Sequence, residues 1–182
     1  AWINSIGRNT GFHMDFGADW NGHKIGIPFN IVPASQTAVN VVFDESPDES
    51  DSGPYPIPAS PLIEDATDGH ILIVRQDECK LYELYHAYKV GSTWHAYSGA
   101  IWDLNSNALR PDGWTSADAA GLPILPGLVR YDEVAAGVIS HAIRFTISDS
   151  QRAYLWPGRH YASSNTDPNV PPMGARFRLK AD

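Results

Sequence analysis

The chain has 182 residues and a mass of 20.0 kDa, and 43% of its residues are apolar, so it can bury the core of one domain. Its 13 basic and 21 acidic residues give a net charge of −8, which disfavours nucleic acid as a partner because binding depends on cations at the phosphates. No apolar run approaches the ~18 residues of a membrane-spanning helix. We expect a single domain over residues 1–182.

Short segments bounded by turn residues follow one another along the chain, which contains 14 Pro and 15 Gly. Apolar or alternating patterns predict strands over residues 38–43, 70–75, 81–88, 94–103, 139–147, 152–160 and 175–181. Residues 110–127 are too rich in proline for a sheet and predict a long ordered loop, with a helical turn over 117–120 and another over 131–136. The pattern favours an all-β fold, an antiparallel β-sandwich of jelly-roll type with long Pro/Gly-rich loops.

The acidic residues are concentrated in one stretch. Residues 44–68 contain eight carboxylates and no Lys or Arg, which predicts a solvated acidic loop. Residues 144–180 contain six basic and two acidic residues, and this excess of positive charge faces either an anionic ligand, the acidic loop or solvent.

The compartment is indicated by the chain start and by its cysteine content. Cys79 is the only cysteine, so the chain cannot form an intrachain disulfide, and an apolar setting favours a structural thiol. Removal of a secretory signal leaves a chain that starts like this one, with Ala1 rather than Met. We expect a secreted, extracellular protein.

Seven stretches together carry a resemblance to a known family: FHMDFG at 12–17, GIPFNIVP at 26–33, GPYPIP at 53–58, CKLYELY at 79–85, DLNSN at 103–107, GWTSADAAGLP at 113–123 and PPMGAR at 171–176. The chain resembles a family of mostly secreted bacterial proteins to which no activity is assigned, so the resemblance implies no site. It does imply that related chains continue into a helix and another hairpin, and hence that a chain ending at Asp182 is shortened.

Common catalytic motifs are missing from the sequence, which has no Gly-x-Ser-x-Gly, Gly-x-Gly-x-x-Gly, phosphate-binding loop or His-Glu-x-x-His. Glu83 lies among apolar and aromatic residues, which predicts a raised pKa suited to a general acid. Glycoside hydrolysis would need a second carboxylate, for which Asp15 is the first candidate, with Asp103 and Asp132 as others. The alternative is a buried ion pair of Glu83 with Arg144 or Arg178.

Histidines provide a second hypothesis. Strand alternation would place His13 and Asp15 on one face, with His141 on an apolar face and His160 near a strand end. If His13, His141 and His160 converge, they offer three imidazoles to zinc or copper, with Asp15 as a fourth or supporting ligand. Each histidine alone is more typical of a hydrogen-bonded structural residue, and the sequence identifies no particular cofactor.

Aromatic residues are abundant, and six of them are Trp. Sugar rings stack on flat aromatic faces, so Trp20, Trp94, Trp114 and Trp156 are candidate ligand-binding residues. The sequence thus favours a secreted carbohydrate-active protein that acts on or binds a polysaccharide. A non-catalytic carbohydrate-binding module and a structural subunit of an extracellular assembly remain as alternatives, and the sequence leaves open whether the protein is an enzyme.

Overall fold

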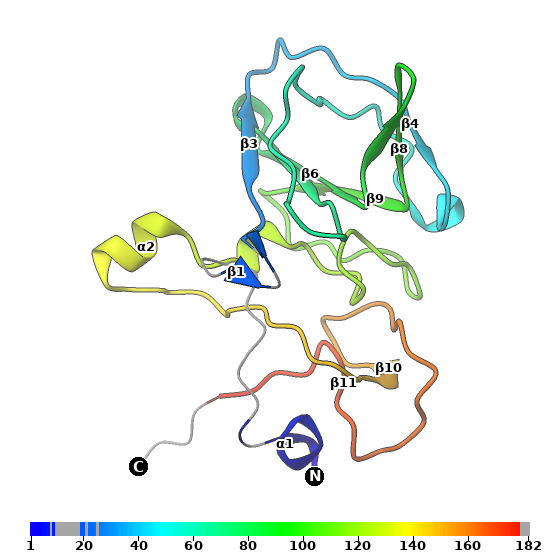
Figure 1. Cartoon of the computed structure of the whole chain (residues 1–182), viewed down its shortest axis with the longest axis vertical. Coiled ribbons are helices and arrows are strands. Elements are labelled where there is room, and N and C mark those ends of the chain that lie inside the picture. The colour runs from blue at the N-terminus through cyan, green and yellow to red at the C-terminus, as the bar shows by residue number, and fades with distance from the viewer. Residues whose placement is uncertain (8, 10–18, 21, 25, 179–182) are drawn as a thin grey trace.

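The computed structural model describes residues 1–7, 9, 19–20, 22–24 and 26–178 (Figure 1). Within them the chain is mostly β, as the sequence predicts. The helical elements are brief: α1 spans Trp2–Ile6, α2 spans Tyr131–Ala136, and the 3₁₀ turns η1, η2 and η3 span Pro47–Glu49, Gln76–Glu78 and Leu125–Gly127. None of the helices in this part of the chain has the length and apolar character needed to cross a membrane.

The larger sheet has four strands in the order β3-β5-β6-β9, which span Phe29–Val32, Ile71–Arg75, Lys80–Tyr85 and Ser98–Asp103. Strand β6 runs antiparallel to both of its neighbours, β5 and β9, whereas the edge strand β3 runs parallel to β5. The first three residues of β5 are all buried, which is typical of a strand covered on both faces. Both faces of this sheet are therefore packed against other parts of the chain.

A second sheet has three strands in the order β4-β8-β7, which span Val41–Phe43, Thr93–Ala96 and Tyr88–Val90. Strands β7 and β8 form a hairpin that turns at Gly91, where φ is 60°, while β4 runs parallel to β8. The predicted antiparallel arrangement is therefore wrong for β3–β5 and β4–β8. Side-chain alternation identifies strands but not their direction, which depends on the long connections between them.

The two strands predicted over residues 81–88 and 94–103 are each divided between the two sheets. Strand β6 ends at Tyr85 and β7 begins at Tyr88, because His86 adopts a φ of 50° that a strand cannot contain. On the return, β8 ends at Ala96 and β9 begins at Ser98. The same two segments therefore contribute to both sheets and hold them together.

The ends of the chain contain less regular structure than predicted. Two small sheets are present: β1 at Asp19–Trp20 pairs antiparallel with β2 at His23–Lys24, and β10 at Gln151–Tyr154 pairs parallel with β11 at Pro172–Met173. Helix α2 confirms the predicted helix over 131–136, but residues 117–120 form turns. The strands predicted over 139–147 and 175–178 are irregular chain, and 179–181 lie outside the described residues.

One face of the four-stranded sheet packs on the three-stranded sheet. Strand alternation directs Ile71 and Ile73 of β5 and Tyr82 and Leu84 of β6 toward this interface. The core comprises Val32, Val41, Tyr55, Ile57, Ile71, Ile73, Tyr82, Leu84, Ala87, Trp94 and Ala96. Tyr55 is completely buried at its centre.

The opposite face of the four-stranded sheet is covered by the loop of residues 115–128. Leu72 of β5 packs there against Ala117, Ile124 and Leu128 of the loop. The predicted long ordered loop is thus a covering layer, and Glu83 of β6 lies beneath it.

Candidate functional site

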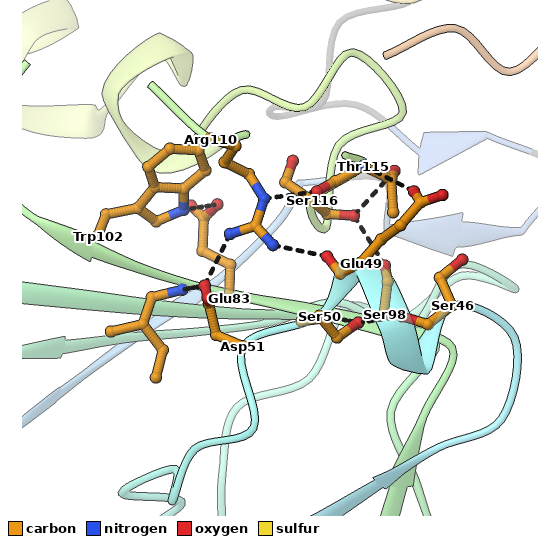
Figure 2. A network of polar contacts seen from close by, with 12 residues as sticks. Ser46, Glu49, Ser50, Asp51, Glu83, Ser98, Trp102, Arg110, Thr115 and Ser116 are labelled. Atoms are coloured by element: carbon orange, nitrogen blue, oxygen red, sulfur yellow. Dashed lines mark hydrogen bonds and ion pairs between the residues drawn. The ribbon is translucent and has the colours of Figure 1, made fainter. Parts of the chain in front are cut away.

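Glu83 lies in the middle of β6, and its side chain is fully buried under the 115–128 loop. Its carboxylate accepts hydrogen bonds from the backbone N–H groups of Ile124 and Leu125, both at 2.9 Å. It also accepts one from the indole Nε1–H of Trp102 at 3.2 Å (Figure 2). These bonds fasten the loop to the sheet. The carboxylate has no exposed surface that a substrate could contact.

The predicted rise in the pKa of Glu83 is confirmed. Burial raises this pKa to about 7, against the opposing effect of the N–H groups of Leu125 and Ile124, which favour the charged form. The groups that hold the carboxylate are backbone N–H groups and an indole. In this arrangement the perturbed pKa belongs to a residue that supports the loop.

Arg110 makes a second connection between loops (Figure 2). Its guanidinium is nearly enclosed and donates hydrogen bonds to the carbonyl oxygen of Thr115, the carbonyl oxygen of Glu49 and a carboxylate oxygen of Asp51, at 2.5, 2.6 and 2.7 Å. A buried charge of this kind requires such partners. Arg110 therefore ties the acidic segment to the loop that covers Glu83.

A buried imidazolium completes this group of contacts. The ring of His70 lies 2.6 Å from a carboxylate oxygen of Glu64 through Nδ1 and 3.1 Å from the carbonyl oxygen of Ala117 through Nε2. Both partners are acceptors, so both ring nitrogens must donate and the ring is charged. Burial opposes this charge, but Glu64 outweighs it and raises the pKa of His70, while that of Glu64 is lowered.

The predicted metal ligands are not brought together in the described part of the chain. His13 and Asp15 lie outside the described residues. His141 lies 3.0 Å from a carboxylate oxygen of Glu133, and His160 contacts the carbonyl oxygen of Ala119 at 2.9 Å. Among the residues that the structure describes, no three His, Cys, Asp or Glu side chains are grouped so that they could hold a metal ion.

For two of the predicted ligand-binding tryptophans, the structure shows no accessible ring. Trp94 is 9% exposed and belongs to the core between the sheets, because the alternation of β8 turns it inward. The prediction that a sugar stacks on Trp94 therefore conflicts with its burial. Trp20 lies in β1, and the structure does not describe its side chain.

The other two predicted tryptophans lie beside arginines. Trp114 is half-buried, with the guanidinium of Arg110 5.5 Å from its ring centre, so it contributes to the enclosure of Arg110. Trp156 is 66% exposed and has the guanidinium of Arg176 at 5.5 Å. Of the three predicted tryptophans whose side chains are described, Trp156 presents the most open ring.

A more extensive set of partly exposed rings lies where the two sheets exchange strands. We call it the aromatic face, and it consists of Tyr85, His86, Tyr88, His95 and Tyr97 together with Asp44. Tyr88 and His95 stack at 5.5 Å between ring centres, and His86 and Tyr97 stack at 4.2 Å. An edge-to-face contact of 5.8 Å between His86 and Tyr88 joins the two pairs. The result is a continuous row of rings on the protein surface.

Strand register explains this row. Tyr88 of β7 lies directly opposite His95 of β8, and His95 in turn lies opposite Val42 of β4. These residues alternate with the buried Trp94, so they point away from the core. Tyr88 is 37% exposed and Val42 is 45% exposed, which leaves the outer side of the three-stranded sheet open.

Asp44 fixes the orientation of one ring pair. Its carboxylate accepts a hydrogen bond from the hydroxyl of Tyr88 at 2.6 Å and lies 3.0 Å from Nδ1 of His95. The bonds from Tyr88 and His95 lower the pKa of Asp44, and the bond to Asp44 raises that of Tyr88. The rings are therefore held in place before any ligand arrives, which reduces the entropic cost of binding.

The sequence did not single out this face, although the strands predicted over residues 81–88 and 94–103 contain all of its rings. The available signal was the alternation of side chains along β8: once Trp94 is assigned to the core, its neighbours Thr93 and His95 must face solvent. His86 could not be found in this way, because its left-handed backbone interrupts the alternation.

A hollow of about 610 Å³ lies elsewhere, between β3 and α2. Its lining is mostly apolar, with Phe29, Leu128 and Tyr131 among the residues that form it. Arg130 also lines it, but its guanidinium is already paired with Glu133 at 2.5 Å. This hollow is the main rival to the aromatic face as a binding site.

Comparisons of the chain with protein-family models, with curated proteins and with solved structures found no match. The functional argument therefore rests on the geometry of the aromatic face.

Proposed function

We propose that this chain is a secreted, non-catalytic glycan-binding module with a β-sandwich fold, and that it stacks sugar rings on the aromatic face. The observation that carries the proposal is the row of stacked, partly exposed rings of His95, Tyr88, His86 and Tyr97. The C–H groups of a pyranose ring pack on such rings, and a neighbouring carboxylate can accept hydrogen bonds from the sugar hydroxyls. Asp44 lies in the position to do so.

The binding function is preferred to a hydrolytic one because of the surroundings of the two kinds of group. Glu83, the predicted general acid, is enclosed by a loop that it anchors. The aromatic face, by contrast, carries partly exposed rings and a partly exposed carboxylate. A binding module needs only the second arrangement.

The test is a binding assay on a panel of insoluble and soluble polysaccharides, including cellulose, xylan, mannan, chitin and chitosan. Tyr88→Ala removes a ring from the middle of the row, and we expect it to weaken binding at least tenfold, as stacking losses of about 1.5 kcal/mol would require. The matched control is Tyr131→Ala, which removes an 88% exposed tyrosine from α2 beside the rival hollow.

We expect the control to bind like the unmodified protein. Equal loss in both variants, or loss only in Tyr131→Ala, would move the site away from the aromatic face. Absence of binding to every member of the panel would overturn the proposed function itself.

A further inference from the structure

The eight carboxylates of residues 44–68 are not equivalent in the structure. Asp51 forms an ion pair with Arg110 at 2.7 Å, and Glu64 lies 2.6 Å from His70. The carboxylate of Glu49 accepts the backbone N–H of Thr115 at 2.9 Å. These three carboxylates are therefore committed to holding loops together.

Three other acidic residues of this segment, Asp44, Glu45 and Asp68, are exposed. Asp44 belongs to the aromatic face, Glu45 follows it in the chain, and the backbone carbonyl of Asp68 accepts the N–H of His86. The hydrogen bond from the Tyr88 hydroxyl to Asp44 is the largest cause of the raised pKa of Tyr88. The charges of Asp44 and Glu45 raise this pKa further. Burial raises the pKa of Tyr85 first, and the charge of Asp68 adds to it. The rings thus lie in the field of these carboxylates.

Asp68 is placed there by the backbone. Its carbonyl oxygen accepts the N–H of His86 at 2.8 Å, and the carbonyl oxygen of Thr67 contacts Nδ1 of the same histidine at 2.8 Å. The turn at residues 67–68 therefore rests against the ring pair of His86 and Tyr97.

Positive groups near the face are fewer. Lys89 lies on β7 between Tyr88 and Val90, but alternation turns it away, and its ammonium lies 4.9 Å from the ring centre of Trp94. The ring of His70 lies 5.4 Å from that of Tyr85, but its charge is paired with Glu64. His86 and His95 are the titratable bases of the face itself. Even if both were protonated, two positive charges would meet three carboxylates.

We propose that the aromatic face selects glycans that carry protonated amino groups, such as polymers of glucosamine, over neutral and acidic glycans. This inference rests on the proposed function and adds the chemical class of the ligand. An ammonium group gains from the negative face of an aromatic ring and from nearby carboxylates, and exposed contacts of each kind contribute about 0.5–1 kcal/mol. An acidic sugar at the same place would be repelled by Asp44, Glu45 and Asp68.

The experiment compares the glucosamine hexamer with the N-acetylglucosamine hexamer by titration calorimetry near pH 6 and at low salt. The two probes have the same sugar backbone, and an acetyl group on each nitrogen of the second keeps that nitrogen uncharged. We expect the unmodified protein to bind the glucosamine hexamer about tenfold more tightly, and this preference to shrink as salt is added.

The critical variant combines Glu45→Gln with Asp68→Asn, which removes two charges but leaves the hydrogen bonds of Asp44 to Tyr88 and His95 in place. We expect it to lose most of the preference for the glucosamine hexamer while its affinity for the acetylated hexamer stays the same. The matched control is Asp132→Asn, which removes an exposed carboxylate from α2 and should change neither affinity.

The failures of the inference and of the proposed function can be told apart. Equal affinity for the two hexamers, with both weakened by Tyr88→Ala, overturns the preference for amines and leaves a glycan-binding face. An unchanged preference in the combined variant also overturns the inference. If neither hexamer binds and no other polysaccharide of the panel does, both proposals fall.

Discussion

The region beneath the 115–128 loop and the aromatic face both contain aromatic and ionisable side chains, but they differ in where the polar atoms are directed. Beneath the 115–128 loop, the polar atoms of Glu83, Arg110 and His70 are directed toward backbone N–H and carbonyl groups of the loop. On the aromatic face, Tyr88 and His95 share Asp44 and present the remainder of their surface to solvent. In the first arrangement, the polar side chains form their hydrogen bonds with other groups of the protein and not with a ligand.

This difference indicates how a perturbed pKa should be interpreted in this molecule. The raised pKa of Glu83 by itself resembles that of a catalytic acid. Its partners show that the same shift arises when a carboxylate is buried to hold a loop. Accessibility, more than the pKa, separates the structural region from the candidate site.

The largest effect on folding is expected at Arg110. Arg110→Met leaves Asp51 and two carbonyl oxygens without their buried donor, and should lower the free energy of unfolding by about 3–5 kcal/mol. Urea denaturation measures this loss. Arg178→Met, at an exposed position, should leave the midpoint unchanged, and comparable losses in the two variants would contradict the structural role of Arg110.

A smaller loss is expected at Glu83. In Glu83→Gln one acceptor oxygen is replaced by an amide N–H₂, which must face N–H donors in either orientation: those of Ile124 and Leu125, or those of Ile124 and Trp102. This should cost about 1–3 kcal/mol. Urea denaturation again measures the change, with Glu45→Gln as a control at an exposed carboxylate. A Glu83→Gln variant as stable as the unmodified protein would show that these bonds do not hold the loop.

The pH dependence of stability follows from the same residues. The folded pKa of Glu83, about 7, lies above its ordinary value of 4.5, so its favourable contribution is complete below about pH 4.5 and is lost as pH rises through about 7. The raised pKa of His70 acts in the same direction above its ordinary value of 6.5. Urea midpoints should therefore fall between about pH 5 and pH 8, and Glu83→Gln should flatten this fall. A midpoint that rises over this range would contradict the assignment.

The smallest effect is expected from the removal of one hydroxyl. Tyr88→Phe keeps the ring but loses the hydrogen bond to Asp44, so we expect glycan affinity to fall only about twofold, since ring area dominates stacking. Calorimetry with the best ligand of the panel measures this. If Tyr88→Phe were as damaging as Tyr88→Ala, the hydroxyl rather than the ring would be the main contact.

Local patterns in the sequence predicted the centre of the fold well. The branched apolar run of β5 and the helix α2 lie close to where the pattern indicates, and the raised pKa of Glu83 followed from its apolar neighbours. These features depend on residues that are near one another in the chain.

What the sequence could not predict depends on contacts between distant segments. The N–H groups that hold Glu83 come from Ile124 and Leu125, and no periodicity brings that loop to β6. The direction of β3 and β4 likewise depends on long connections. The residue type alone predicts Trp94 as a stacking residue, whereas the alternation of side chains along β8 buries Trp94 and leaves its neighbour His95 partly exposed.

The most direct test of the central claim follows the imidazole signals of the histidines by nuclear magnetic resonance while the best-binding oligosaccharide is added. His86 and His95 lie on the aromatic face, whereas His160 lies against the carbonyl oxygen of Ala119 and His141 lies beside α2. We predict that the signals of His86 and His95 shift in proportion to bound ligand while those of His160 and His141 do not. Shifts confined to His160 or His141, with His86 and His95 unmoved, would contradict the proposed site.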